Sequence, residues 1–578
     1  MGAFSAVIPL RSLRPGLGSS QLLFAYAAFA AAVVVALAVC FAFGLDTLAV
    51  GYSRVLRFVP LGIVSALSFP LIVNLASRDL PAVRHLRASP KVATGVCVAF
   101  ALLAFVATAL LGAGVLQAFP ISGDEVAYLE QAKLLAHGRL SADVLPIQQY
   151  LAQEYMFPFG GKLISQYPPG WPAILAIAEL LSIPVVLVNP IIAALTIVAL
   201  HRFALARSGP EVAIATTAMV ALSAFFLFNS ADFLNGCLVA LLGVLFAGAF
   251  VSFMENPRAG TALLVGLWIS TIAATRHLDA ALFAAPAAVV MLRDGARRHW
   301  NPAPLIVLGA VPLLALLLLY YRQITGHPFV LPQTLRDAGD GLLGPKWRIV
   351  QSTEILVGRF VELAEWVSPL FVLAFAWAFV LKLRGRALRF YDLYGPLFLI
   401  GYWFYWSDGG LRWGARYIYP AFPFMALLVA DATWRALQKP TTRVLLLAHL
   451  VAASTLVSAL QVPFLAARAY QIVSTIQDIF TQVRRADLHN AVVVAAASTG
   501  TIWRLFPGDL ARNDLNFDAD VIYAHSPGLL SKQVTQGELE RTVRDLHAYY
   551  PTRPIWIYLR QADAREGRLV QAAPGPMP

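Results

Sequence analysis

Two adjacent carboxylates, Asp124 and Glu125, follow directly on a 32-residue uncharged run, residues 92–123. A run of this length predicts a membrane crossing, so the pair would lie close to one membrane surface. Carboxylates at that depth are typical of a base that takes a proton from a substrate, or of a divalent-cation site. A structural alternative is that Ser122 or Asp124 caps a helix over 125–137, whose N-terminus favours negative charge. The two interpretations are compatible.

A cluster of ionisable residues lies at the end of a later apolar segment. Thr275-Arg276-His277-Leu278-Asp279 places three ionisable residues within four positions. Such a cluster is costly at membrane depth unless its members pair with each other or line a wet cavity. Either Arg276 pairs with Asp279, or Arg276 and His277 form part of an anion site, for which the guanidinium fork is suited.

Two further arginines, Arg412 and Arg416, lie four residues apart among glycines and aromatic residues, and Tyr417 follows the second. They would share one face if this segment were helical. Arginines that extend to the membrane surface from an interfacial position are the alternative. Together with Arg276, they place three arginines on one membrane face, which favours a site for a lipid phosphate.

A proline-rich motif, Tyr-Pro-Pro-Gly-Trp-Pro, begins at Tyr167. Two prolines followed by Gly170 predict a rigid entry into a helix. The aromatic residues Tyr167 and Trp171 are also typical of the aromatic belt at a membrane surface. By itself, this motif indicates structure rather than chemistry.

The composition decides where these residues lie. The 578 residues are 59% hydrophobic and 13% charged, whereas about 25% of a soluble domain is charged. This excludes a cytosolic enzyme, a disordered chain and a secreted disulfide scaffold. The net charge of +12 comes from short basic clusters between apolar runs, where such residues set topology, so no nucleic-acid partner is expected. The three cysteines, Cys40, Cys97 and Cys237, show no disulfide or zinc spacing.

The apolar segments predict an all-α polytopic membrane protein with about thirteen crossings. Residues 171–201 are interpreted as one crossing preceded by a short helix, because Pro184 and Pro190 interrupt the segment. The long uncharged runs are 22–45, 58–77, 92–123, 180–201, 212–231, 233–254, 300–321 and 444–467, and the shorter runs are 259–275, 280–292, 366–381, 393–407 and 417–430.

Basic loops set the orientation. The strongest lie near residues 78–91, 293–298, 382–389 and 435–443. Even numbers of predicted crossings separate them, so all four can face the cytoplasm. The N-terminus is then cytoplasmic and the C-terminus extracytoplasmic. The outer side receives Asp124, the three arginines, the loops 119–170 and 322–365, and everything after about residue 468.

The end of the chain changes character, which divides it into a transmembrane module, 1–467, and a small extracytoplasmic α/β domain, 468–565. Capping-box spacing from Thr535 to Glu538 predicts a helix in that domain. A disordered tail, 566–578, is expected to follow. Three short apolar runs predict the strands of the α/β domain: Ala491–Ala497, Asp520–Ser526 and Pro554–Leu559.

The order of these motifs resembles the GT-C superfamily of membrane glycosyltransferases, most closely the protein O-mannosyltransferase and lipid A aminoarabinose transferase types. The resemblance covers most of residues 90–440. It is carried by the acidic pair, the Tyr-Pro-Pro-Gly-Trp-Pro entry, the Thr-Arg pair at 275–276 and the Arg-Tyr-x-x-Pro-x-x-Pro pattern from Arg416. Such relatives often have Lys or His where this chain has Tyr167, and the shortest of them lack the two helices before residue 90.

The resemblance implies an inverting transferase that moves a sugar from a polyprenyl-phosphate donor to an acceptor at the outer face of a bacterial inner membrane. The implied base or acceptor-orienting group is Asp124, with Glu125 beside it. Because Tyr167 replaces the usual cation, the phosphate contacts are expected mainly from Arg276, Arg412 and Arg416.

Tyr167, His277 and Tyr417 are expected to bind substrate beside these arginines, and the glycine-containing loop 322–365 is a candidate lid. Binding of a divalent cation by Asp124 and Glu125 is an open alternative. The acceptor is a lipid, a glycan or a protein. Two alternative functions remain, a transporter of a polyprenyl-linked glycan or lipid and a structural envelope subunit.

Overall fold

The computed structural model describes residues 88–572, except for short internal gaps. The predicted crossings 22–45 and 58–77, together with Cys40, Arg412 and the last six residues, lie outside the described part. The gaps are 154, 296–301, 337–343, 345, 408, 410–412, 437–439, 498–511, 527–535 and 561–565.

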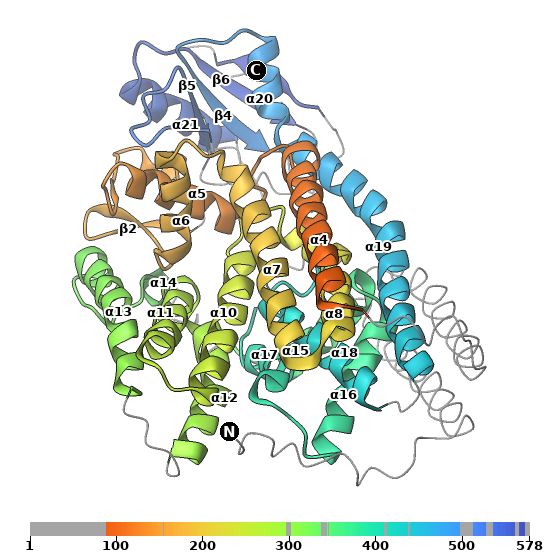
Figure 1. The fold of residues 1–578 in the computed structure, drawn as a ribbon. Helices are drawn as coiled ribbons and strands as arrows, with labels where there is room; N and C mark the ends of the chain where they lie inside the picture. The colour runs from red at the N-terminus through yellow and green to blue at the C-terminus, as the bar shows by residue number, and fades with distance from the viewer. Residues whose placement is uncertain are drawn as a thin grey trace.

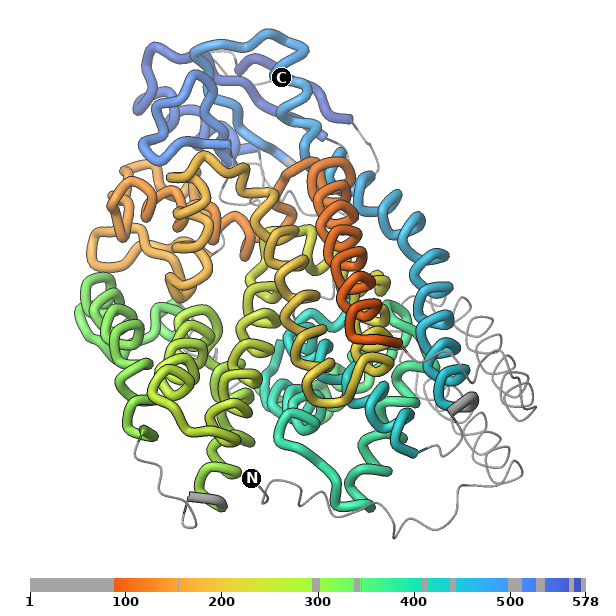
Figure 2. The backbone as a smooth tube through the Cα atoms, viewed as in Figure 1, coloured from red at the N-terminus to blue at the C-terminus, as the bar shows by residue number. Residues whose placement is uncertain are grey.

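A bundle of helices makes up most of the described chain, with the long helices α4 and α19 along one side and α11 and α13 on the other (Figures 1 and 2). The helices are α4 (Pro90–Leu110), α5 (Gly123–Ala136), α6 (Gly170–Leu180), α7 (Val188–Ser208), α8 (Pro210–Ala221), α9 (Ala224–Asn229), α10 (Gly236–Glu255), α11 (Ala259–Thr275), α12 (His277–Gly295), α13 (Pro304–Thr325), α14 (Pro332–Arg336), α15 (Ile349–Trp366), α16 (Pro369–Arg384), α17 (Tyr394–Trp403), α18 (Phe422–Ala436), α19 (Pro440–Ile476) and α20 (Asp478–Arg485).

Five described helical segments are long and apolar enough to cross a membrane: Pro90–Val115, Val185–Ser208, Gly236–Glu255, Pro304–Thr325 and Arg443–Ile476. Helices α15 and α16 meet at a bend of 119°, and counting this bent pair as one span raises the number among the described residues to six. The chain is therefore a multi-pass membrane protein. The total of thirteen crossings stays a prediction.

Two predicted segments differ from the structure. The run 212–231 is not one helix: α8 ends at Ala221, and Ser223 caps the start of α9 by accepting a hydrogen bond from the Phe226 N–H. The predicted lid 322–365 is not a loop throughout, because residues from Ile349 onward form α15. Ile355, Arg359 and Leu363 are buried on one face of this helix, at a spacing of four residues that favours helix packing.

By contrast, the segment 171–201 follows the predicted arrangement. The short helix α6 is followed by a break near Pro184, and α7 then runs from Val188 to Ser208.

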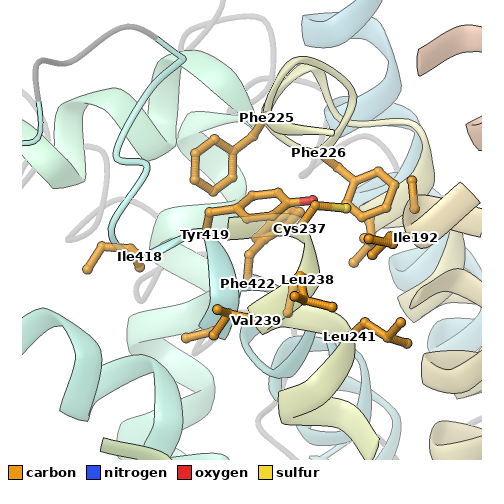
Figure 3. Packing of buried hydrophobic residues seen from close by; sticks show 14 of the residues in the cluster. Ile192, Phe225, Phe226, Cys237, Leu238, Val239, Leu241, Ile418, Tyr419 and Phe422 are labelled. Carbon is orange, nitrogen blue, oxygen red and sulfur yellow. The ribbon is translucent and has the colours of Figure 1, made fainter. Parts of the chain in front are cut away.

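One large apolar core joins the helices. In Figure 3, the ring of Tyr419 lies between Phe225 and Phe226 and points toward Cys237. The hydroxyls of Tyr419 and Ser230 share a hydrogen bond of 2.7 Å, and the Cys237 thiol donates to Ser230 Oγ at 3.4 Å. These contacts hold the turn between α9 and α10 against the segment before α18.

A four-stranded sheet with α21 (Gln536–Tyr549) covers one end of the bundle, above α5 and α6 (Figure 1). Its strand order is β5-β4-β6-β7, with β4 parallel to β5 and β6. Strands β4 (Ala491–Ala497), β5 (Val521–His525) and β6 (Ile555–Arg560) form at the three predicted segments.

The predicted disordered tail is wrong at its start. Arg568–Gln571 form β7, which pairs antiparallel with β6. The Gly567 N–H also donates to Asp478 Oδ2 at 2.6 Å. Without β7, strand β6 would be at the edge of the sheet. The hydrogen bonds to β6 order this short segment, and its composition alone does not predict them.

The first outer loop joins the bundle to this sheet. It contains a small antiparallel sheet of β1 (Ala142–Asp143), β3 (Lys162–Ser165) and β2 (Met156–Phe159). Between β1 and β2, the side chains of Ile147, Tyr150 and Leu151 enter the same apolar cluster as Val494 of β4 and Leu546 of α21. The loop is therefore built partly around the core of the C-terminal sheet.

This shared core predicts that Ile147→Ala lowers the free energy of unfolding by ~2–4 kcal/mol, because it leaves a cavity where a fully packed side chain was. The matched control is Leu140→Ala in the same loop, since Leu140 is 37% exposed and Ile147 only 4%. Thermal unfolding of the detergent-purified protein, with hydrogen exchange of β4 and β5, measures the effect. Equal destabilisation by both variants would contradict the shared core.

Candidate functional site

A cavity of about 970 Å³ opens among the first outer loop, the junction of α11 and α12, helix α14 and the segment between α17 and α18. The predicted site residues that line it are Asp124, Tyr167, Arg276, His277, Arg416 and Tyr417. Residues more than 290 positions apart in the sequence thus face one space. Arg412 lies outside the described residues, and Glu125 is not part of the lining.

Asp124 lies in the first turn of α5. Ser122, not Asp124, caps this helix, since its hydroxyl accepts from the Glu125 N–H at 3.2 Å. The Asp124 carboxylate is therefore available for other contacts: the Tyr167 hydroxyl donates to Oδ1, and Arg416 Nη2 lies 3.2 Å from Oδ2. The side chains of Asp124 and Arg416 are 19% and 12% exposed, so this ion pair is largely shielded from water.

Glu125 points away from the cavity, although it is adjacent to Asp124. One oxygen, Oε2, accepts from the Ile121 N–H at 3.0 Å and the Ser122 hydroxyl at 2.7 Å. The other, Oε1, accepts from the Phe233 N–H at 3.1 Å. A buried carboxylate with these partners fixes the start of α5 against the turn before α10. The geometry therefore supports a structural role for Glu125 rather than the predicted catalytic one.

Arg276 lies at the break between α11 and α12, where its backbone is extended. Its Nη1 donates to Asp279 Oδ2 at 3.1 Å, so the local pair foreseen as an alternative is present. The guanidinium also lies 5.2 Å from the centre of the Tyr417 ring, which stacks on Tyr402 at 4.6 Å. Tyr402 in turn donates to Asp279 Oδ1. Arg276 is thus held on two sides and lines the cavity as well.

His277, the next residue, lines the same cavity. Its Nε2 lies 2.9 Å from the Tyr321 hydroxyl of α13. The imidazole consequently links α12 to α13 at the cavity wall.

The proline-rich motif fixes the loop against the α11–α12 break. Trp171 is buried, and its indole N–H donates to the Phe233 carbonyl at 2.8 Å. Trp171 is therefore a core residue and not a residue of a membrane-surface belt. A Cβ added at Gly170 would lie 2.5 Å from the Ala274 carbonyl oxygen. Only glycine permits α6 to begin this close to the residues before Arg276.

We expect Gly170→Ala to lower the free energy of unfolding by ~1–3 kcal/mol, because α6 must move away from the backbone of α11. The variant should also weaken ligand binding in the cavity, because moving α6 away from α11 increases the separation between Tyr167 and Arg276. The control is Gly260→Ala on α11, where an added Cβ has no neighbour within 4 Å. Thermal unfolding of both variants measures the effect, and equal melting temperatures would contradict the close approach.

Sequence reasoning missed Arg336 on α14. Its Nη1 donates to Gln166 Oε1 at 2.9 Å, and its guanidinium lies 4.5 Å from the centre of the Tyr155 ring. Arg336, Gln166 and Tyr155 all line the cavity. Gln166 directly precedes the proline-rich motif, but no spacing in the sequence connects that motif to α14.

The described residues hold no cluster of three or more His, Cys, Asp or Glu side chains arranged to bind a metal ion. Asp124 and Glu125 point in different directions, so the adjacent pair does not form a joint ligand set in this structure.

No family model matches the sequence, and no curated protein matches it significantly. Solved structures do match. ArnT from Cupriavidus metallidurans in the apo state is 12% identical with a TM-score of 0.50, and the match covers 81% of this chain and 93% of that protein. The same ArnT bound to undecaprenyl phosphate is 11% identical with a TM-score of 0.50, covering 82% and 93%.

Arabinofuranosyltransferase AftD from Mycobacteria is 15% identical with a TM-score of 0.39, and the match covers 75% of this chain and 32% of that protein. The match to ArnT extends over nearly all of that protein, so this chain has the fold of ArnT. The resemblance found in the sequence is thereby confirmed at the level of the fold.

Proposed function

We propose that this protein is an inverting glycosyltransferase that moves a sugar from a polyprenyl-phosphate donor to an acceptor hydroxyl. The observation that carries the proposal is the meeting of Asp124, Arg276 and Arg416 in one large cavity. The fold shared with ArnT, which was solved bound to undecaprenyl phosphate, supports a polyprenyl phosphate as the donor's carrier.

The chemistry requires one base and a cationic site for the leaving group. Asp124 accepts the proton of the acceptor hydroxyl while the hydroxyl oxygen attacks the anomeric carbon. The bond between that carbon and the donor phosphate oxygen breaks, and the polyprenyl phosphate leaves with the bonding electrons. Arg276 and Arg416 stabilise the negative charge that develops on the phosphate, so no general acid is needed. Attack opposite the leaving group inverts the anomeric centre.

The rest of the cavity suits a sugar. Tyr128, Tyr405, Trp406 and Tyr417 line it together with the polar side chains of Asn229 and Asn235. Aromatic faces pack on the apolar C–H faces of a sugar ring, while amides bond its hydroxyls. This mixture favours a glycosyl group over a purely apolar ligand.

The proposed setting is the outer face of a bacterial inner membrane, with the N-terminus in the cytoplasm and the C-terminal sheet outside. There the donor's polyprenyl chain stays in the bilayer while its phosphate reaches the arginines. The acceptor is a lipid, a glycan or a protein with a hydroxyl that reaches Asp124.

The test is transfer of radiolabelled sugar from a panel of undecaprenyl-phosphate-linked sugars to a membrane extract by the purified full-length protein. We expect a new glycosidic bond, identified by mass spectrometry and by the inverted anomeric proton coupling. Movement of labelled lipid across liposomes without any new bond would instead establish the transporter alternative.

A further inference from the structure

Tyr167 lines the cavity wall beside Asp124, and its hydroxyl donates to Oδ1 of the Asp124 carboxylate. Its ring packs against Tyr128 at 4.6 Å and Tyr155 at 5.6 Å. Gln131 Nε2 donates to the Tyr167 carbonyl at 3.3 Å. Both the backbone and the ring are therefore held, so the hydroxyl is fixed in space before any ligand arrives.

The two oxygens of Asp124 have different kinds of partner. Oδ1 accepts from the neutral Tyr167 hydroxyl, whereas Oδ2 faces the Arg416 guanidinium. A guanidinium has five N–H donors and binds phosphate well. When a donor phosphate binds, Arg416 can turn from the carboxylate toward the phosphate. Oδ2 then loses this ion pair and becomes a stronger base than before, since a paired carboxylate holds a proton poorly.

When Arg416 turns toward the phosphate, the orientation of the Asp124 carboxylate depends more strongly on Tyr167. A carboxylate that loses an ion pair rotates more readily, and its reactive oxygen can then turn away from the acceptor. The Tyr167 hydroxyl keeps Oδ1 in place throughout the exchange. Burial of the ring, followed by the nearby Asp124 charge, raises the pKa of Tyr167 well above its usual value, so the hydroxyl remains a donor.

We propose that Tyr167 is a positioning residue that holds Asp124 through Oδ1, so that Oδ2 is the oxygen that takes the acceptor proton. The kinetic consequences of this inference rest on the proposed function, whereas the contact between Tyr167 and Asp124 does not. The inference differs from the expectation that Tyr167 binds the substrate directly.

The first test reads Asp124 directly and needs no enzymatic activity. A hydrophobic carbodiimide labels protonated carboxyl groups, so the pH dependence of Asp124 labelling, followed by peptide mass spectrometry, reports its protonation. Tyr167→Phe keeps the ring but removes a hydrogen bond to the ionised form, so the labelling midpoint should move to higher pH by roughly one unit. Incorporation of 3-fluorotyrosine at position 167 keeps the fold and strengthens the donor, so the midpoint should move to lower pH.

The matched control is Tyr320→Phe. Its hydroxyl accepts from Gln131 Nε2 at 2.8 Å and belongs to the same local network, but it does not line the cavity. Tyr320→Phe should leave the midpoint unchanged. An unchanged midpoint in both Tyr167 variants overturns the proposal, whether or not the protein transfers sugar.

The second test is kinetic. Tyr167→Phe should lower kcat about tenfold, move the acidic limb of the pH profile upward, and leave KM for the polyprenyl-phosphate sugar within twofold. A raised KM with an unchanged kcat and pH profile would show instead that Tyr167 binds the phosphate. If the wild-type protein transfers no sugar, the proposed function fails, and the labelling result still decides the role of Tyr167.

Discussion

Asp124→Asn is expected to reduce sugar transfer by ~10²–10⁴-fold, the usual contribution of a general base. Asparagine has nearly the same shape, and its carbonyl can still accept from the Tyr167 hydroxyl, so the fold should be retained. The Arg416 charge is no longer neutralised in this variant, so affinity for undecaprenyl phosphate should be unchanged or higher. Transfer assays and lipid binding on the same preparation separate these two effects.

The neighbouring carboxylate provides the control for this prediction. Glu125→Gln exchanges an acceptor for a donor within a buried site where Ile121, Ser122 and Phe233 all donate. We expect a loss of ~1–3 kcal/mol in the free energy of unfolding. Activity per folded molecule should fall less than in Asp124→Asn. Full activity of Asp124→Asn, or the reverse order of the two variants, would remove Asp124 as the base.

The second large effect is expected from Arg416→Gln. It removes a cation that the proposed mechanism assigns to the leaving phosphate, which predicts a loss of ~10²–10³-fold in kcat/KM. Arg416→Lys should recover only part of the activity, because the ammonium lacks the planar fork and its stacking on Tyr417, whose ring centre lies 5.5 Å from the guanidinium. Steady-state kinetics with varied lipid-linked donor measure both variants.

A matched arginine outside the cavity is Arg139, which lies 3.7 Å from the exposed carboxylate of Asp143. Arg139→Gln should change neither donor affinity nor transfer, because an exposed pair contributes little. The double variant Asp124→Asn/Arg416→Gln tests the ion pair itself: if the pair only supports the fold, the double variant should recover the stability lost by either single change. A kcat/KM of Arg416→Gln equal to that of wild type would contradict the assignment.

The first outer loop packs against two parts of the structure, the helix bundle and the C-terminal sheet. Tyr167 is held by the bundle through Gln131 and Gly170, whereas Ile147 and Tyr150 are held by the sheet. The loop that carries part of the cavity wall is thus packed against the sheet in its middle and against the bundle at its C-terminal end. Substitutions in the core of the C-terminal sheet can therefore affect the site through this loop, although the described residues of the sheet do not line the cavity.

Part of the candidate site was predictable from local sequence. An uncharged run followed at once by Asp124 indicates a carboxylate near a membrane surface, and Arg276 and Arg416 lie at equivalent ends of other apolar segments. Charge is so costly in the membrane interior that its rare occurrences mark chemistry or structure. The same cost explains why the apolar runs predicted most described helices well.

Other features were not predictable, because they depend on direction and distance. Adjacent residues in a helix project about 100° apart, so sequence alone could not show that Asp124 faces the cavity and Glu125 faces the Phe233 backbone. The contact of Arg336 with Gln166 spans 170 positions, and no local pattern encodes it. The pairing of β7 likewise depends on β6, which lies outside its own short sequence.

The sequence by itself determined that this chain is a membrane protein with helical crossings, and it marked the few charges that stand apart from the cytoplasmic loops. It could do so because transfer into a membrane depends on local composition. Only the tertiary structure decided that Asp124, Tyr167, Arg276 and Arg416 meet in one cavity. Their meeting depends on how distant helices pack, which is a property of the whole chain and not of any one segment.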